Sequence, residues 1–370
     1  MVVGRLASRC AYSVLNLESV ARSNYMKFGN FLFPGATDSE RDAQVINETL
    51  QEAQLCDRLG MDMVWLSEHH FDGICAYVDP VAFAAAIASS TSTVGIGFAV
   101  AQMSLHHPIR LAEQMSLIDN ISQGRVLLGL GRGTAYNIYE YQGYDVDPDE
   151  AFERLLEAEK LMIDAWTTPN LVHNGKFWNV RLPELRPRPF TQPHPRVIRA
   201  CSGAESALEM ARLGRPFLMN VQNNQVTRER MDAYRATMAE SGYSAADIAA
   251  NVDQTWVWRN IFVADTDSLA EELAIPAFEE QIAFRHAMRE RVYAEQGVRM
   301  QQETVKPARA QASQAVLCGS PETVANAIAE IDDIGVGGLI LQFRLGSMSY
   351  EVAQRSIELF MSEVAPRFRD

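Results

Sequence analysis

The sequence predicts an α/β protein whose strands close into a parallel (β/α)8 TIM barrel. Short apolar runs alternate eight times with longer segments of helical periodicity. The runs hold few polar residues, which is typical of strands covered by helices on the outside and by core on the inside. With 370 residues, 47% of them hydrophobic, the chain can bury a core of that size. Eight such units in succession predict a closed barrel.

The first four units follow from local signals. A helix expected over 39–60 places Ile46 and Ala53 on one face, and Gly60 ends it. Asp79 and Pro80 form an N-cap and first-turn proline for an alanine-rich helix, and a further proline opens the helix at 108. The strands are expected at 27–33, 63–66, 94–98 and 125–131.

The last four units resemble the first four, with two additions. Asp147 and Pro148 start a long helix that ends near residue 166. The remaining strands are expected at 196–202, 216–220, 256–264 and 338–343. We expect a proline-rich insertion at 171–195, before strand five, and a long polar loop at about 293–314, after strand seven. Residues 1–25 are interpreted as an irregular N-terminal extension and 26–370 as a single barrel domain.

Composition excludes several classes of function. The net charge is −14 and no run of Lys and Arg is present, so we expect no nucleic-acid partner. No apolar run is long enough to span a membrane, and the first 25 residues lack the apolar core of a secretory signal. The five cysteines are scattered and form no CxxC pair, which indicates reduced thiols. We therefore expect a cytoplasmic protein.

The run Glu68-His69-His70 follows the second strand, at the barrel face where active sites lie. Adjacent side chains of an extended chain point to opposite sides, so the two histidines are not expected to bind one metal ion. The same holds for His106-His107, and no HExxH motif is present. We predict no metal site. One histidine is expected to face the barrel mouth, where it suits proton transfer, and the other a packing partner.

Two further segments indicate a ligand. Gly129, Gly131 and Gly133 surround Arg132, but their spacing is not that of a dinucleotide-binding GxGxxG motif. The glycines either ease the exit of the strand or let a ligand approach the backbone beside a fixed cation. The run 200–206 supplies amides and hydroxyls at a helix start, where a phosphate is favoured, although Glu205 would oppose it. Together they suggest a phosphorylated planar ligand.

With these segments the chain resembles the bacterial luciferase-like family of flavin-dependent monooxygenases. The resemblance extends, in the family's order, over nearly everything after residue 25. It rests on MKFGNFLF (26–33), GMDMVWLSEHHF (60–71), the block from HHPIRLAEQ to GLGRG (106–133), RACSGAES (199–206) and CGSPETVANAI (318–328).

This resemblance implies a two-component enzyme that receives reduced FMN (FMNH2) from a separate flavin reductase. With O2 it would oxygenate a small or medium apolar organic substrate through a C4a-peroxyflavin, by hydroxylation, epoxidation or a Baeyer–Villiger reaction. His69 would be catalytic, and a non-proline cis peptide would join Ala99 to Val100 beside the flavin ring. The implied cofactor-binding residues are Ala99, Val100, Arg132, Cys201, Ser202, Gly203 and Ser206.

The chain also departs from the light-emitting members. They have a reactive cysteine where Gly131 stands, and a glutamate where Cys201 stands. The segment HNGKFW (173–178) is closer to the terpene and ketone monooxygenase branch. F420-dependent oxidoreductases share the barrel and are the alternative, together with non-catalytic flavin-binding homologues. The resemblance also implies a homodimer, formed through the helix that starts at Pro108 and its neighbour from Asp79.

Overall fold

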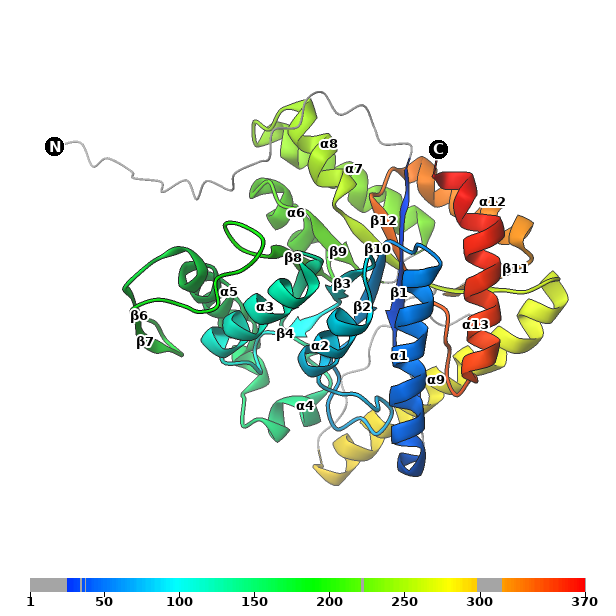
Figure 1. The fold of residues 1–370 in the computed structure, drawn as a ribbon, viewed down its shortest axis with the longest axis horizontal. Helices are drawn as coiled ribbons and strands as arrows, with labels where there is room; N and C mark the ends of the chain where they lie inside the picture. Colours follow the sequence, from blue (N-terminus) through cyan, green and yellow to red (C-terminus); the bar gives the residue numbers. More distant parts are fainter. Residues whose placement is uncertain (1–24, 34, 37, 221–222, 298–314, 370) are drawn as a thin grey trace.

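The computed structural model describes residues 25–33, 35–36, 38–220, 223–297 and 315–369. Eight parallel strands, each hydrogen-bonded to the next, form a closed ring in which the last strand pairs with the first (Figure 1). In ring order they are β1 (Lys27–Leu32), β2 (Met63–Leu66), β3 (Gly95–Phe98), β5 (Val126–Gly131), β8 (Arg196–Cys201), β9 (Phe217–Met219), β10 (Trp256–Val263) and β12 (Gly338–Gln342). The predicted (β/α)8 barrel is confirmed.

An outer layer of helices covers the barrel (Figure 1). As predicted, Asp79 caps α2 by accepting hydrogen bonds from the backbone N–H groups of Val81 and Ala82, and Pro80 occupies the first turn. The principal helices are α1 (Asp42–Arg58), α2 (Pro80–Ser90), α3 (Pro108–Ser122), α5 (Ala151–Thr167), α6 (Ala204–Arg212), α7 (Asn224–Glu240), α8 (Ala245–Asp253), α9 (Asp267–Glu295), α12 (Pro321–Ile334) and α13 (Tyr350–Leu359). In the described parts of the chain, no helix is long and apolar enough to cross a membrane.

Trp65 fills the interior of the barrel. Its side chain is fully buried and meets the ring of Trp256 edge-on at a centroid distance of 5.0 Å. Gly29 and Gly97, on the two neighbouring strands, make room for it, because a Cβ at either position would lie within 2.4 Å of the indole. The interior is therefore packed with side chains, and a ligand has to bind at a mouth of the barrel.

The structure adds elements that the sequence analysis did not predict. These are β4 (Ala101–Gln102), α4 (Ile138–Gly143), the hairpin of β6 (Leu171–Asn174) and β7 (Asn179–Leu182), and β11 (Val316–Gly319), which pairs with β10. The hairpin belongs to the predicted insertion. Its turn is held by Glu157 of α5, which accepts hydrogen bonds from the backbone N–H groups of Lys176, Phe177 and Trp178. Because Glu157 is distant in sequence from the turn that it holds, no local pattern predicts this contact.

The segment after β10 begins differently from the prediction. The expected polar loop started near residue 293, but α9 continues to Glu295. Tyr293 is buried, and its hydroxyl donates a hydrogen bond to the carbonyl of Tyr136, so the helix is held against the barrel mouth there. The rest of the predicted loop, residues 298–314, lies outside the described residues.

Candidate functional site

The candidate site lies at the carboxyl ends of the barrel strands. In Figure 1 this end faces α4 and the C-terminal half of α9. The loops after β2, β3, β5 and β8 carry the residues that the sequence singled out, so the fold brings them to one mouth of the barrel.

His69 is held by a buried carboxyl group. Its Nδ1 atom lies 3.0 Å from Oε1 of Glu140, a fully buried residue of α4. Gln102 and Asn137 donate side-chain hydrogen bonds to the same carboxyl group, at 3.2 and 3.3 Å. The His69 ring also meets Phe33 edge-on at 5.4 Å. A carboxylate only accepts hydrogen bonds, so Glu140 places the proton of the partly exposed imidazole on Nδ1 and leaves Nε2 as the hydrogen-bond acceptor.

The neighbouring His70 has a different partner, as the alternation of side chains predicts. Its Nε2 lies 2.9 Å from Oε1 of the buried Glu68, and His106 lies 2.9 Å from the same oxygen. Burial alone would raise the pKa of Glu68, but the charge of His106 and hydrogen bonds from His106, His70 and the Gln102 backbone lower it to about 2. Burial would lower the pKa of His106, and Glu68 raises it instead. This cluster fixes the loop that carries His69.

Across the residues that the structure describes, no group of three or more His, Cys, Asp or Glu side chains lies where it could hold a metal ion. The roles of Glu140 and His106 were missed because Glu140, on α4, and His106, in the loop before α3, are both distant in sequence from His69 and His70. The sequence gives one local signal for Glu140, which is its place in the short run 138–143, where a glutamate would be buried.

The segment after β3 contains the non-proline cis peptide that the resemblance implies, between Ala99 and Val100. Both residues are half-buried at the mouth. Gly129 and Gly131 of β5 pack against this segment. A Cβ at Gly129 would lie 1.9 Å from the carbonyl oxygen of Phe98, and one at Gly131 would lie 2.5 Å from a methyl group of Val100. These two glycines therefore accommodate the chain itself, which is the structural alternative that the sequence left open.

Arg132 follows the end of β5 with its backbone fixed and its side chain exposed. Its carbonyl accepts hydrogen bonds from the hydroxyls of Ser104, at 2.7 Å, and Tyr141, at 2.8 Å. The exposed guanidinium beside a rigid backbone suits an anion at the mouth of the barrel.

The start of α6, which follows the neighbouring strand β8, is open to solvent. Ser202 and Gly203 are exposed, and a Cβ at Gly203 would meet nothing within 4 Å. The Ser206 hydroxyl lies 3.4 Å from the Gly203 amide nitrogen. Glu205, which the sequence suggested would repel an anion, is paired with Arg212 at 2.8 Å, along the helix and away from its first turn. A helix start with free space before it can accept a phosphate.

Arg230 of α7 is a second cation at this end, and the sequence analysis missed it. Its guanidinium donates to the carbonyl of Ser202, at 3.3 Å, and lies 3.5 Å from the side-chain oxygen of Asn220. Burial lowers its pKa, which indicates a charge held partly out of water. Cys201, in contrast, is buried, and burial raises the pKa of its thiol to about 12, so its side chain is uncharged at neutral pH. That Cys201 contacts a cofactor stays a prediction.

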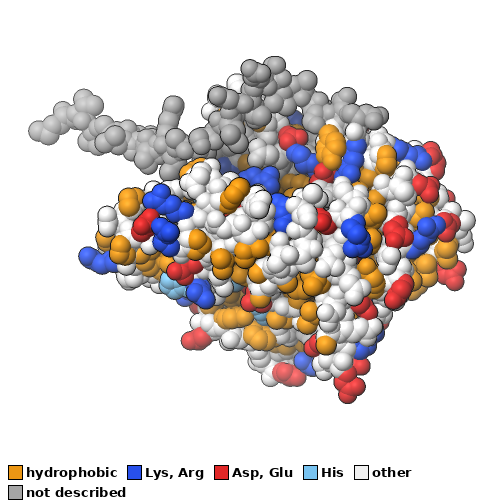
Figure 2. All heavy atoms as spheres, in the orientation of Figure 1, with side chains coloured by type: hydrophobic (Ala, Val, Ile, Leu, Met, Phe, Trp, Pro, Cys, Tyr) orange, Lys and Arg blue, Asp and Glu red, His pale blue; other side chains and the backbone are white. Residues whose placement is uncertain are grey.

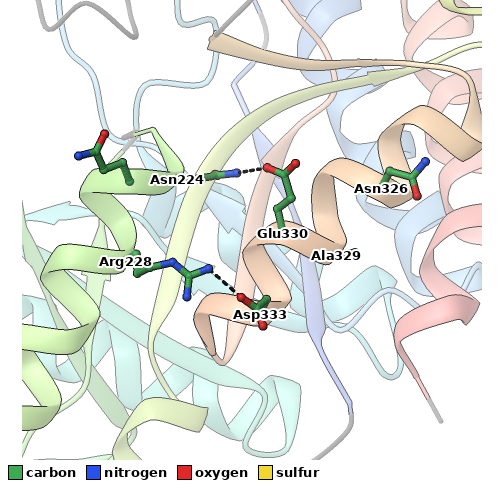
Figure 3. A pocket seen from close by; sticks show the side chains of 7 residues that line it. Asn224, Arg228, Asn326, Ala329, Glu330 and Asp333 are labelled. Atoms are coloured by element: carbon green, nitrogen blue, oxygen red, sulfur yellow. Dashed lines mark hydrogen bonds and ion pairs between the residues drawn. The ribbon is translucent and has the colours of Figure 1, made fainter.

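A hollow elsewhere on the surface is not a candidate site. It lies between α7 and α12 in the outer helical layer (Figure 3). Its polar groups are already paired, since Arg228 forms an ion pair with Asp333 at 2.8 Å and Asn224 donates to Glu330 at 3.1 Å (Figure 3). Because these side chains already have polar partners, they do not indicate a ligand.

The chain is similar in sequence to luciferase-like and other flavin-dependent monooxygenases. The family model described as luciferase-like monooxygenase matches residues 26–337. An uncharacterised protein of Sinorhizobium fredii, y4wF, is 32% identical over 242 residues, which cover 65% of this chain and 69% of that protein. The oxygenase component of a flavin-dependent trigonelline monooxygenase of Acinetobacter baylyi is 30% identical over 173 residues, covering 46% of this chain and 48% of that protein.

Solved structures agree with the fold. The monooxygenase RslO1 of Streptomyces bottropensis superposes with a TM-score of 0.78 at 26% identity, covering 93% of this chain and all of that one. The oxygenating constituent of 3,6-diketocamphane monooxygenase of Pseudomonas putida, a type II Baeyer–Villiger enzyme in complex with FMN, gives 0.74 at 20% identity, covering 93% of this chain and 99% of that one. An F420-dependent secondary alcohol dehydrogenase gives 0.70 at 15% identity, covering 94% of this chain and all of that one, so this fold is shared by proteins that use either cofactor.

Proposed function

The chain belongs to the luciferase-like monooxygenase family, and on this premise we propose that it oxygenates an organic substrate with O2 and reduced FMN. The flavin would come from a separate flavin reductase and act as a diffusible substrate. The observation that carries the proposal is the shared location of two features at one barrel mouth. These are a histidine oriented by a buried glutamate and an open, cationic helix start.

The residues present fit an FMN phosphate. The open space before Gly203 admits it to the first turn of α6, and the guanidinium groups of Arg132 and Arg230 supply positive charge. Ser202 adds an exposed hydroxyl at the same turn, and the Ser206 hydroxyl, which donates to the Gly203 carbonyl at 3.0 Å, fixes its shape. Ala99 and Val100 then form the surface that the flavin ring would contact.

When bound, reduced FMN supplies the reaction with dioxygen, and the protein supplies orientation and proton transfer. Glu140 keeps the imidazole of His69 in one tautomer, so Nε2 is the atom that accepts or donates a proton at the site. Phe33, buried beside the His69 ring, excludes water from that side.

The activity is tested by adding air-saturated buffer to anaerobic protein mixed with reduced FMN, in a stopped-flow spectrometer. We expect the protein to change the spectrum and rate of flavin reoxidation relative to free FMN. A parallel trial with reduced F420 distinguishes the alternative cofactor. Reoxidation at the rate of free FMN, despite measured binding, would identify a non-catalytic flavin-binding protein.

Phosphate recognition is tested by comparing FMN with riboflavin. Arg132→Ala and Arg230→Ala should each weaken FMN binding roughly tenfold, as expected for a lost charged hydrogen bond, and leave riboflavin binding nearly unchanged. Arg228→Ala is the matched control on α7, because that side chain is already paired with Asp333. An equal loss for both flavins would place these arginines elsewhere in the mechanism.

A further inference from the structure

We propose that the substrate of this site is a compact organic carboxylate whose head group binds Arg285. This inference rests on the proposed function, because it names the class of molecule that the same site would oxygenate. It is carried by a cation at the barrel mouth that has no ion-pair partner among the side chains that the structure describes.

Arg285 projects from α9 onto the ring of Phe33, with its guanidinium carbon 4.3 Å from the ring centroid. The same Phe33 ring contacts His69, so Arg285 and the proposed catalytic histidine are separated by a single side chain. A small molecule held at Arg285 would therefore lie one aromatic ring away from the group that would move a proton.

The guanidinium of Arg285 has no hydrogen-bond or ion-pair partner among the residues that the structure describes. It is nevertheless half-buried, and burial lowers its pKa. Asp72 acts on it only at a distance, and the Asp72 carboxyl group already accepts the backbone N–H groups of Ile74 and Cys75, at 2.9 and 3.1 Å. A partly desolvated arginine with free donors favours an anion, and its planar fork matches a carboxylate.

The proposed phosphate site of the cofactor does not include Arg285. The proposed phosphate cradle starts at the end of β8, and β8 lies four strands from β1 in the ring of eight. Phe33, which Arg285 covers, directly follows β1, on the opposite side of the mouth. An FMN phosphate in the cradle therefore leaves Arg285 free for a second anion.

The carboxylate must be compact and largely apolar. Arg285 stacks on the ring of Phe33, and the His69 ring meets the same ring at 5.4 Å, so an aromatic surface joins the two groups. Arg289, one turn along α9, adds positive charge beside Asn137, to which its Nε donates at 3.0 Å. A single anionic head group on a ring or short chain matches the guanidinium of Arg285 and the aromatic ring beneath it.

The proposal is tested with matched acids and amides on the full-length protein, with and without FMN. Binding of benzoate, benzamide, cyclohexanecarboxylate and cyclohexanecarboxamide is measured by isothermal titration calorimetry. We expect each acid to bind roughly tenfold more tightly than its amide, and Arg285→Gln to remove that difference while FMN affinity is retained. Arg291→Gln is the control, because that exposed side chain lies on the same helix, 3.8 Å from Glu295.

Two results would overturn the proposal. Acids that bind no better than their amides would show that the site does not select an anion. A loss of FMN affinity in Arg285→Gln, with acid binding unchanged, would assign the arginine to the cofactor. If instead FMN fails to bind the parent protein while the acids still depend on Arg285, the proposed oxygenation is wrong and the anion site stands.

Discussion

At the scale of single residues, His69 and His70 show how neighbours acquire separate roles. Both belong to the extended segment after β2, so their side chains leave on opposite sides. His70 turns to Glu68 and to the hydroxyl of Tyr144, while His69 turns to Glu140 at the mouth. The contact of His70 with Glu68 holds the loop, and the contact of His69 with Glu140 orients the imidazole of His69.

Glu140→Gln is expected to reduce turnover without reducing cofactor binding. The amide can point its N–H₂ group at Nδ1 of His69 and so favour the wrong tautomer. We expect kcat to fall about a hundredfold, within the usual range for loss of a proton-transfer group. Steady-state kinetics and FMN titration measure the two effects. Glu140→Asp, which keeps the carboxylate, should recover part of the activity. Unchanged kcat in Glu140→Gln would remove this residue from the mechanism.

The Glu68–His106 pair is expected to give a maximum of stability in mildly acidic solution. The pKa of Glu68 is lowered from its ordinary value of 4.5 to about 2, so its stabilisation is complete above pH 4.5 and lost as the pH falls toward 2. The pKa of His106 is raised above 6.5, so its stabilisation is complete below pH 6.5 and lost as the pH rises through the raised value.

Chemical denaturation between pH 3 and 9 measures this dependence. Glu68→Gln should lower the free energy of unfolding by about 3 kcal/mol near pH 6, because it breaks a buried charged pair, and should flatten the profile. Glu330→Gln, an exposed site on α12, should change it by less than about 0.5 kcal/mol. A Glu68→Gln profile that parallels the parent would show that other groups determine the pH dependence.

At the scale of elements, the mouth is shaped by the packing of the segment after β3 against β5. Gly129 faces a backbone carbonyl, whereas Gly131 faces the side chain of Val100. The two positions look alike in the sequence, yet one contact is with rigid backbone and the other with atoms that can move. Substitutions there should therefore have different outcomes.

Gly131→Ala is expected to fold and to bind FMN less tightly. The new methyl group would lie 2.5 Å from a methyl group of Val100, which must shift toward the site. We expect a cost of about 1–3 kcal/mol in stability and a lower FMN affinity. Gly129→Ala meets a carbonyl oxygen at 1.9 Å and should destabilise the barrel more strongly. Thermal melts and FMN titration compare them, and Gly203→Ala, which meets no atom within 4 Å, controls for stability. Equal melting temperatures of the Gly129 and Gly131 variants would contradict this reasoning.

At the scale of the whole molecule, the face formed by α2 and α3 carries hydrophobic side chains in contact with solvent (Figure 2). Leu117 and Ile121 of α3 are 52% and 43% exposed. On α2, Ala82 is exposed, whereas Ala88 is buried toward the barrel and does not contribute to this face. An apolar face beside small side chains suits close contact with a second copy of the chain.

We therefore predict a homodimer that forms through α2 and α3. Light scattering at micromolar concentration should give twice the chain mass of 41.3 kDa. Leu117→Glu combined with Ile121→Glu should yield the monomer, because two charges cannot be buried at an apolar contact without partners. Leu213→Glu, on an exposed hydrophobic residue beyond α6, should leave the mass unchanged. A parent protein of monomeric mass would refute the dimer.

The sequence by itself determined the eight barrel strands, the N-cap of the helix that starts at Pro80 and the position of His69 at a strand end. These follow from signals within a few residues, such as apolar runs, Asp79-Pro80 and the order of strand and loop. The family resemblance added the cis peptide between Ala99 and Val100. Only the tertiary structure decided that Glu140 orients His69, that Gly129 and Gly131 leave room for neighbouring chain atoms, and that Arg230 and Arg285 approach the mouth. Each of these contacts joins residues on different elements, and the distance between two such side chains is set by how the barrel closes and packs, which no local pattern encodes.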